Sequence, residues 1–249
     1  MVGIETIIVD SHKEVLPYWF REYQKLKSPL VEVRIDKHHD MSDECAALPA
    51  REGGQILGYL KRIEPYLSYY TEREINEANF TCPAFHYGII GALYHFNPRF
   101  ETIDAYGRVC GARFINNPKT KQQTTMISGK RSIQLFWDEN HTKLRVKGGK
   151  VIPVPEKLTI KEFEKDLSQS RLPLIIGFDL DSICAIDEKN LDEETLSRRL
   201  DKSKEVLDCV PSPSFACIAR SQTPRAYVPP SLVDHLQEKA VSLIERAYS

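Results

Sequence analysis

The sequence predicts an α/β protein with three layers, in which helices cover both faces of a mostly parallel central sheet. Apolar, β-branched segments typical of buried strands recur along the chain at Glu5–Asp10, Leu30–Ile35, Leu172–Phe178 and Ser214–Ala219. Segments with helical spacing of apolar residues separate them. Strands that alternate with helices usually pair in parallel and are covered on both faces.

The helices are predicted from their start signals and their periodicity. Thr159 and Glu162 form a capping box that opens a helix running through about Ser168. Further helices are expected over 193–209, from a cap at Ser231 to the C-terminus, and over 72–94 in two pieces broken near Pro83.

The stretch from Tyr106 to Val154 has a different character. Glycines and an Asn-Asn-Pro turn separate short strand-like pieces, which is typical of β-hairpins. We expect a β-rich insertion or arm over 106–154, within a single domain that spans residues 1–249.

Composition excludes several classes of protein. The 34 basic and 35 acidic side chains nearly cancel, so no overall charge attracts nucleic acid or an anionic membrane. No apolar run reaches the length that spans a bilayer, and the N-terminus lacks the pattern of a secretion signal. A cytoplasmic protein with reduced, mainly structural cysteines is therefore expected, and no signal specifies an oligomeric state.

Histidine and aspartate residues follow three of the predicted strands. These residues are His12 after the first strand, Asp36, His38 and Asp40 after the second, and Asp179 and Asp181 after the third. The carboxyl ends of parallel strands meet at one edge of a sheet, and residues two apart on an extended chain point the same way. Four carboxylates at one place would repel each other, so divalent metal ions are the natural counter-charge.

Each of these His and Asp motifs also has a simpler or a competing explanation. A single Asp or His after a strand is usually a turn or capping residue. His39 and Asp40 could form the doublet of an HD phosphohydrolase, but that class is all-helical. The segment Asp36–His38 could open a calcineurin-type phosphoesterase, but that family's later motifs are missing.

The same motifs resemble a known family. An apolar strand ending in Asp-x-His-x-Asp, followed much later by a strand ending in Asp-x-Asp, is similar to the metal signature of the ureohydrolases, the arginase and agmatinase superfamily. The segments 12–19, 35–41, 177–181, 218–221 and 227–229 resemble more narrowly an arginase-like family. Members of that family include peptide arginases, which convert arginine to ornithine within ribosomally made peptides.

The resemblance implies an arginase-like fold that holds two Mn²⁺ ions per chain. One ion would be bound by His12, Asp36, Asp40 and Asp179, and the other by Asp36, His38, Asp179 and Asp181. The metal-activated water would attack the guanidinium carbon and release urea, with Asp40 protonating the leaving amine. The implied partner is an arginine-containing precursor peptide.

The sequence differs from arginases in the residues that would contact the substrate. Arginases carry a glutamate after the strand that corresponds to Ser214–Ala219, and none is found there. Our candidates for contacts to the substrate are therefore Asp43, Glu44 and Glu14, although a helix-start acid also explains Glu14. His86 is the candidate proton shuttle, with structural packing as the alternative. No clamp for the α-carboxylate and α-ammonium of free arginine is recognisable, which favours a peptide substrate.

Two other hypotheses stay open at this stage. One is a different C–N hydrolysis on the same fold, with free arginine, agmatine or an acylated amine as substrate. The other is a metal-stabilised binding protein without catalysis. The six candidate ligands argue against the latter, because a structural metal is usually closed by four.

Overall fold

The computed structural model describes residues 3–40, 71–73, 75–81, 84, 89–106, 156–188 and 191–249, and the backbone of short strands between some of these ranges.

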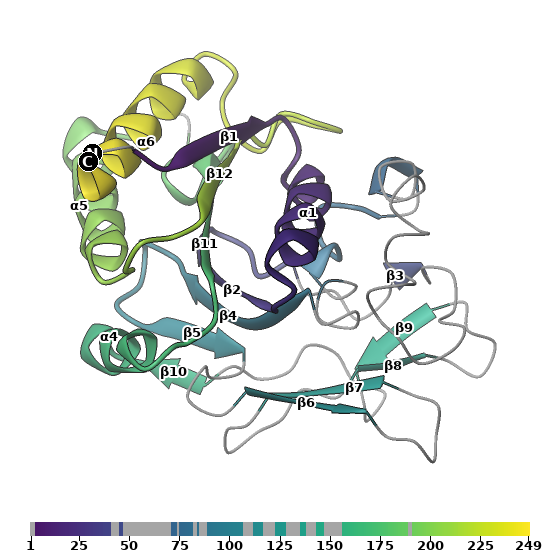
Figure 1. The fold of residues 1–249 in the computed structure, drawn as a ribbon. Helices are drawn as coiled ribbons and strands as arrows, with labels where there is room; N and C mark the ends of the chain where they lie inside the picture. Colours follow the sequence, from purple (N-terminus) through teal and green to yellow (C-terminus); the bar gives the residue numbers. More distant parts are fainter. Residues whose placement is uncertain are drawn as a thin grey trace.

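A seven-stranded sheet forms the centre of the molecule (Figure 1). Its strands, in spatial order, are β1 (Glu5–Val9), β12 (Phe215–Ala219), β11 (Leu174–Asp179), β2 (Leu30–Ile35), β4 (Ile90–Phe96), β5 (Ile103–Tyr106) and β10 (Glu156–Leu158). Neighbours from β1 to β4 are all parallel, whereas β5 is antiparallel to both β4 and β10. The predicted α/β class with a mostly parallel sheet is therefore confirmed.

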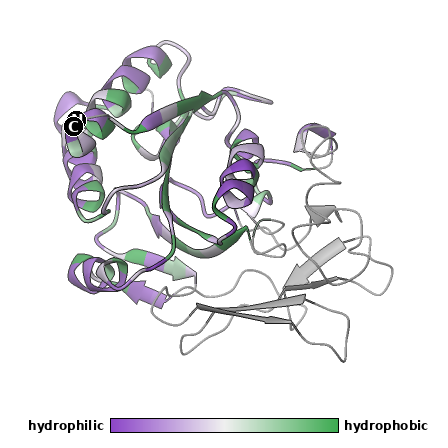
Figure 2. Cartoon of the chain, viewed as in Figure 1, coloured by the Kyte–Doolittle hydropathy of each residue, from purple (hydrophilic) through white to green (hydrophobic). Residues whose placement is uncertain are grey.

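Helices pack against both faces of this sheet (Figure 1). The 3₁₀ turn η1 (His12–Val15) and helix α1 (Leu16–Leu26) cover one face, and α4 (Ile160–Ser168), α5 (Glu193–Asp208) and α6 (Val233–Tyr248) cover the other. Each face has its own cluster of buried apolar side chains. Figure 2 shows largely hydrophobic central strands and helices of mixed hydropathy, as expected when each helix buries one side.

Two helix predictions differ from the structure. Ser231 does not cap the last helix, because α6 begins at Val233 with Leu232 at its N-cap and no side-chain hydrogen bond. The segment from Ile90 to Tyr94 is strand, not helix, and every residue of β4 is buried. Fully buried strands lack the alternation that would identify them, so pairing with β2 and β5 decides this segment. The capping box at Thr159 is confirmed.

The stretch between β5 and β10 contains antiparallel strand pairs. Strand β6 (Ala112–Asn116) pairs with β7 (Gln123–Ile127), and β8 (Leu135–Trp137) pairs with β9 (Lys143–Val146). Strand β3 (Cys45–Ala46) also pairs with β9. These pairings agree with the β-rich character that the sequence predicts, while the organisation as one domain stays a prediction.

The described residues can also be compared with the predictions about membrane spans and cysteines. No helix among them combines the length and the apolar character needed to cross a bilayer. The cysteines described as free are Cys184, Cys209 and Cys217. Burial raises the pKa of the Cys184 thiol, which fits a structural role better than a reactive one.

Candidate metal centre

The six predicted ligands lie at the carboxyl edge of the parallel strands. His12 begins the turn after β1, the segment Asp36–Asp40 follows β2, and Asp179 ends β11 with Asp181 in the next turn, η3 (Leu180–Ser182). His12, Asp36, Asp179 and Asp181 are buried, whereas the His38 side chain is half exposed.

His12 lies among three carboxylates. Its Nδ1 atom is 3.0 Å from Asp36 Oδ2, 3.1 Å from Asp40 Oδ2 and 3.2 Å from Asp179 Oδ2. Despite this proximity, neither ring nitrogen of His12 has a well-formed hydrogen bond within the described part of the chain. Neighbouring ligands of an octahedral ion with bonds of about 2.1 Å lie about 3.0 Å apart. The spacing is therefore compatible with ligands of one metal ion.

A second group shares Asp36 with the first. His38 Nδ1 is 2.9 Å from Asp181 Oδ2, and potential ligand atoms of Asp36, His38 and Asp181 lie within 4.8 Å of one another. Ligand atoms of His12, Asp36 and Asp179 satisfy the same condition. Asp36 therefore belongs to both groups that could hold a metal ion.

Local backbone structure orients these carboxylates. Asp36 Oδ1 accepts a hydrogen bond of 2.7 Å from the amide of His38, and Asp179 Oδ1 accepts one of 3.0 Å from the amide of Asp181. In each case the carboxylate bonds the backbone two residues further on, a turn that Asp forms readily. Asp40 has a φ of 50°, in the left-handed region that Asp tolerates better than most residues.

The carboxylates strongly perturb one another's protonation. Burial, together with Asp40 and Asp179, raises the pKa of Asp36 well above its ordinary value. Burial and the charge of Asp179 raise the pKa of Asp181 to about 6. Burial opposes protonation of His12, but the carboxylates of Asp179 and Asp36 outweigh it and raise the His12 pKa. The cluster thus holds more negative charge than its own groups neutralise, which favours bound cations.

Ser221, in the loop after β12, supports Asp179. Its hydroxyl oxygen lies 2.7 Å and 2.6 Å from the two carboxylate oxygens of Asp179, and the side chain is buried. Ser221 has a φ of 52° in the loop after β12. Sequence reasoning gave this residue no role, although a polar residue at the end of a fourth apolar strand was the available signal.

A buried ion pair lies beneath the centre on β2. Arg34 donates to Glu32 through Nε at 2.9 Å and Nη2 at 2.7 Å, and its Nη2 also donates to Thr81 Oγ1. Its Nη1 lies 3.2 Å from the His39 carbonyl oxygen and 3.5 Å from Asp40 Oδ2. Both charged side chains are fully buried. Arg34 therefore positions the turn that carries Asp40.

Gly177 accommodates this pair from the neighbouring strand. A Cβ atom at Gly177 would lie 2.6 Å from Glu32 Oε1, closer than real side chains approach. A glycine inside a strand often marks such a close approach. Gly177 thus allows Glu32 and Arg34 to lie flat against β11.

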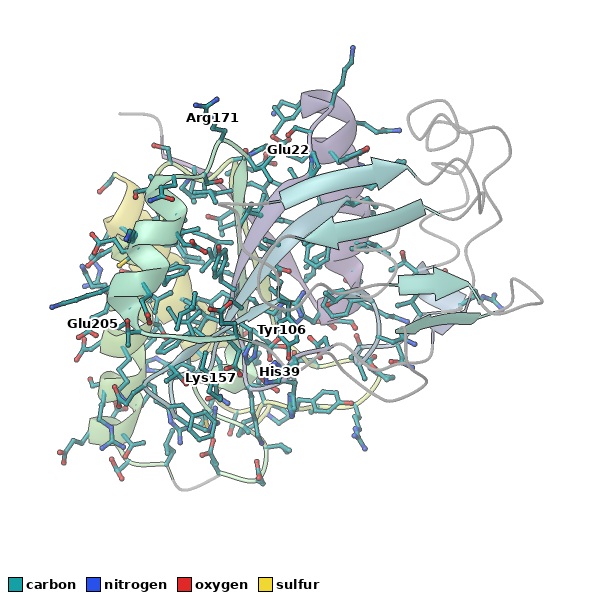
Figure 3. The ribbon with its side chains drawn as sticks, turned by 90° about the horizontal axis from the view of Figure 1, so that it is seen from below. Glu22, His39, Tyr106, Lys157, Arg171 and Glu205 are labelled. Atoms are coloured by element: carbon teal, nitrogen blue, oxygen red, sulfur yellow. The ribbon has the colours of Figure 1, made fainter. Side chains whose placement is uncertain are left out.

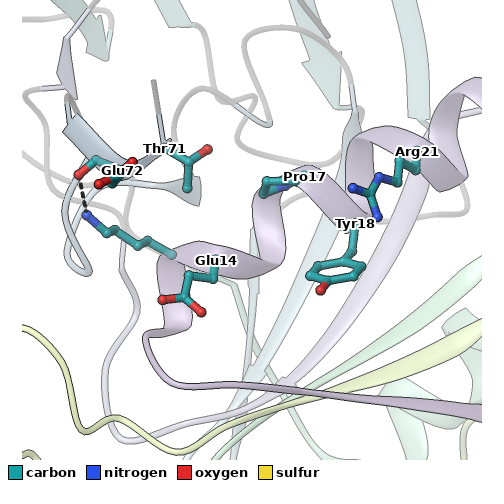
Figure 4. Close-up of a pocket in the computed structure, with 7 residues that line it drawn as sticks. Glu14, Pro17, Tyr18, Arg21, Thr71 and Glu72 are labelled. Atoms are coloured by element: carbon teal, nitrogen blue, oxygen red, sulfur yellow. Dashed lines mark hydrogen bonds between the residues drawn. The ribbon is translucent and has the colours of Figure 1, made fainter. Parts of the chain in front are cut away.

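Of the predicted substrate residues, the structure describes only Glu14. Glu14 lies in the first turn of η1 and accepts a hydrogen bond of 3.3 Å from the amide of Asp10. It also lines a cavity of about 260 Å³ beside α1, together with Lys13, Pro17, Tyr18, Arg21, Thr71 and Glu72 (Figure 4). None of the six His/Asp ligands lines this cavity. Asp43, Glu44 and His86 lie outside the described residues.

No family model and no curated protein matches the chain. The fold and the site define an α/β protein with a mixed, mostly parallel seven-stranded sheet. At the carboxyl edge of that sheet, two groups of His and Asp residues that can hold metal ions share Asp36.

Proposed function

We propose that the protein is a dinuclear manganese hydrolase that converts arginine side chains in a peptide to ornithine and releases urea. The observation that carries this proposal is the shared carboxylate. Asp36 belongs to the group with His12 and to the group with His38, as a bridging ligand would. The sequence motifs that contain these residues resemble those of arginase-like enzymes, and an arginase-like topology forms part of the proposal.

The donor set suits Mn²⁺. Two imidazole nitrogens and carboxylate oxygens from four aspartates favour a hard-to-borderline divalent ion. His12, Asp36, Asp40 and Asp179 would hold one ion, and Asp36, His38, Asp179 and Asp181 the other. When bound, the ions would supply Lewis-acid activation of a water molecule for attack on the guanidinium carbon.

The protein's own residues would complete the reaction. Water oxygen adds to the guanidinium carbon, the bond from this carbon to Nε breaks, and Nε leaves as the ornithine amine. Asp40 would hold the proton that the departing nitrogen receives, since its carboxylate lies 3.1 Å from His12 Nδ1 and faces the same group of ligands. Ser221 would keep the Asp179 carboxylate in one orientation through its hydroxyl.

A peptide substrate is the narrower part of the proposal. It rests on the resemblance to peptide arginases and on the lack of a recognisable sequence pattern that would bind the two α-charges of free arginine. Burying either charge unpaired costs several kcal/mol. An enzyme for free arginine must therefore provide partners for both groups.

The test is incubation of the Mn²⁺-loaded protein with an arginine-containing peptide, free L-arginine and agmatine in parallel. We expect urea only with the peptide, whose mass falls by one carbon, two nitrogens and two hydrogens at each converted arginine. Comparable turnover of free arginine would overturn the peptide assignment while retaining the ureohydrolase. No urea from any guanidinium substrate, with two Mn²⁺ bound, would overturn the proposed reaction.

A further inference from the structure

A second cluster of potential ligands lies on the other side of the segment Asp36–Asp40. It consists of His39 in that segment, His95 on β4 and Asp104 on β5, and potential ligand atoms of all three lie within 4.8 Å of one another. His95 and Asp104 are direct partners in the antiparallel pairing of β4 with β5, so their side chains emerge on the same face of the sheet. His39 reaches them because its ring stacks on that of His95, with centroids 4.0 Å apart.

His95 presents an unpartnered nitrogen to this cluster. The side chain is 1% exposed, and its Nε2 has no hydrogen-bond partner among the described residues. A neutral imidazole whose Nε2 receives no hydrogen bond can present the lone pair of that atom to a cation. Packing alone explains the stacked rings, but buried ring nitrogens normally have a partner.

The other two ligands are held in compatible positions. His39 Nε2 lies 3.6 Å from Asp104 Oδ2. Two ligands of a tetrahedral zinc ion, with bonds of about 2.0–2.1 Å, are about 3.4 Å apart. His39 Nδ1 is 2.6 Å from the Tyr106 hydroxyl, and Lys157 Nζ donates to Asp104 Oδ1 at 2.9 Å. These contacts fix the ring and one carboxylate oxygen, leaving Nε2 and Oδ2 for a cation.

The cluster is open to solvent on one side. The His39 side chain is 34% exposed and that of Asp104 is 14% exposed, whereas His95 forms the buried end. Figure 3 labels His39, Tyr106 and Lys157, which lie near one another at this edge of the sheet. Solvent therefore reaches the cluster from the side of His39 and Asp104.

We propose that His39, His95 and Asp104 form a separate mononuclear site for Zn²⁺, with water as the fourth ligand. Two imidazoles and one carboxylate are a common zinc donor set. The site does not depend on the proposed hydrolase activity, because none of its ligands belongs to the His12 and His38 groups. A bound ion would tie the backbone between His38 and Asp40 to β4 and β5, and would thus stiffen the turn that carries both residues.

The experiment measures metal binding at this site in a variant whose candidate metal centre is altered. In full-length protein carrying both Asp179→Asn and Asp181→Asn, Co²⁺ titration followed by visible absorption should show one ion per chain with the strong d–d bands of tetrahedral geometry. Elemental analysis after dialysis against Zn²⁺ should give one zinc. His39→Gln and Asp104→Asn, both at partly exposed side chains, should each weaken binding at least tenfold with unchanged circular dichroism. Tyr106→Phe should weaken it by no more than about tenfold, since the ligand itself remains.

His235→Gln is the matched control, because His235 is exposed on α6 and belongs to neither cluster. It should leave the Co²⁺ spectrum and affinity unchanged. Equal binding by the Asp179/Asp181 double variant with and without His39→Gln would overturn the proposal. So would a folded double variant that takes up no Co²⁺ or Zn²⁺. Neither outcome bears on urea release, which the wild-type protein tests independently.

Discussion

Two charged clusters flank the turn η3, and they differ in how completely their polar atoms are satisfied. The first is the candidate metal centre. The second, the Glu188 cluster, consists of Glu188, Arg99 and Arg199. Glu188 accepts two hydrogen bonds from Arg199, one from Arg99 and one from the amide of Ala185. The two arginines also donate to backbone carbonyls of Ser182 and Ile183.

The comparison separates a cluster whose charged groups are paired with one another from a cluster that could hold metal ions. In the Glu188 cluster two cations meet one carboxylate, and the arginines clamp the chain from Asp181 to Glu188. In the candidate metal centre carboxylates outnumber cations, and both ring nitrogens of His12 have no well-formed hydrogen bond to described residues. Proteins commonly sacrifice stability at functional sites. Substitutions in the two clusters should therefore have opposite consequences.

Asp179→Asn should have the largest effect, on activity and on stabilisation by Mn²⁺. Removing one charge from a ligand shared by the proposed ions should lower urea release on the order of a thousandfold. The metal-free variant should be at least as stable as metal-free wild type, because repulsion among buried carboxylates decreases. Mn²⁺ should raise the melting temperature of wild type but not of the variant. Thermal melts with and without Mn²⁺ check this, and a strongly destabilised metal-free variant would contradict the comparison.

Glu188→Ala should instead lower stability. The substitution leaves two partly buried guanidinium groups without their carboxylate, at a cost of about 2–3 kcal/mol. Urea denaturation at neutral pH measures this difference. Glu238→Ala, at an exposed position on α6, is the control and should change stability by less than about 0.5 kcal/mol. Equal effects of the two substitutions would show that the Glu188 cluster contributes little.

Gly177→Ala tests the buried pair beneath the candidate centre. The added methyl group would meet Glu32 Oε1 and force the Glu32–Arg34 pair to shift, at a cost of about 1–3 kcal/mol. Because Arg34 also bonds the carbonyl of His39, activity should fall along with stability. Gly3→Ala is the control, since a Cβ there has no described atom within 4 Å. Denaturation midpoints of both variants measure the change in stability. An unchanged midpoint for Gly177→Ala would exclude the close contact between residue 177 and Glu32.

The smallest expected effect is on the pH dependence of stability. Burial would raise the pKa of Glu188, but the hydrogen bonds from Arg199 and Arg99 lower it from 4.5 to about 2. A depressed carboxyl pKa stabilises the fold above the unfolded-state value, and this contribution is lost as pH falls through the folded-state value. Allowing for partial exposure, wild type should lose about 1–2 kcal/mol relative to Glu188→Gln between about pH 5 and pH 2. A stability difference between the two proteins that does not change over this pH range would refute the lowered pKa of Glu188.

The sequence alone was sufficient for the features that depend on local order along the chain. Strands β1, β2, β11 and β12 were predictable from apolar runs, and the helix at Thr159 from its capping box. The positions of the candidate ligands were predictable for the same reason. Residues two apart after a strand point the same way, and the ends of parallel strands converge on one edge.

Only the tertiary structure decided the contacts that depend on which strands are neighbours. Strand β4 was missed because burial on both faces removes the alternation that marks a strand. Ser221 reaches Asp179 because β12 lies beside β11. The cluster of His39, His95 and Asp104 exists because β4 pairs with β5 in one particular register. Register and strand order are set by packing over the whole sheet, so side chains far apart in the chain meet in ways that no local pattern records.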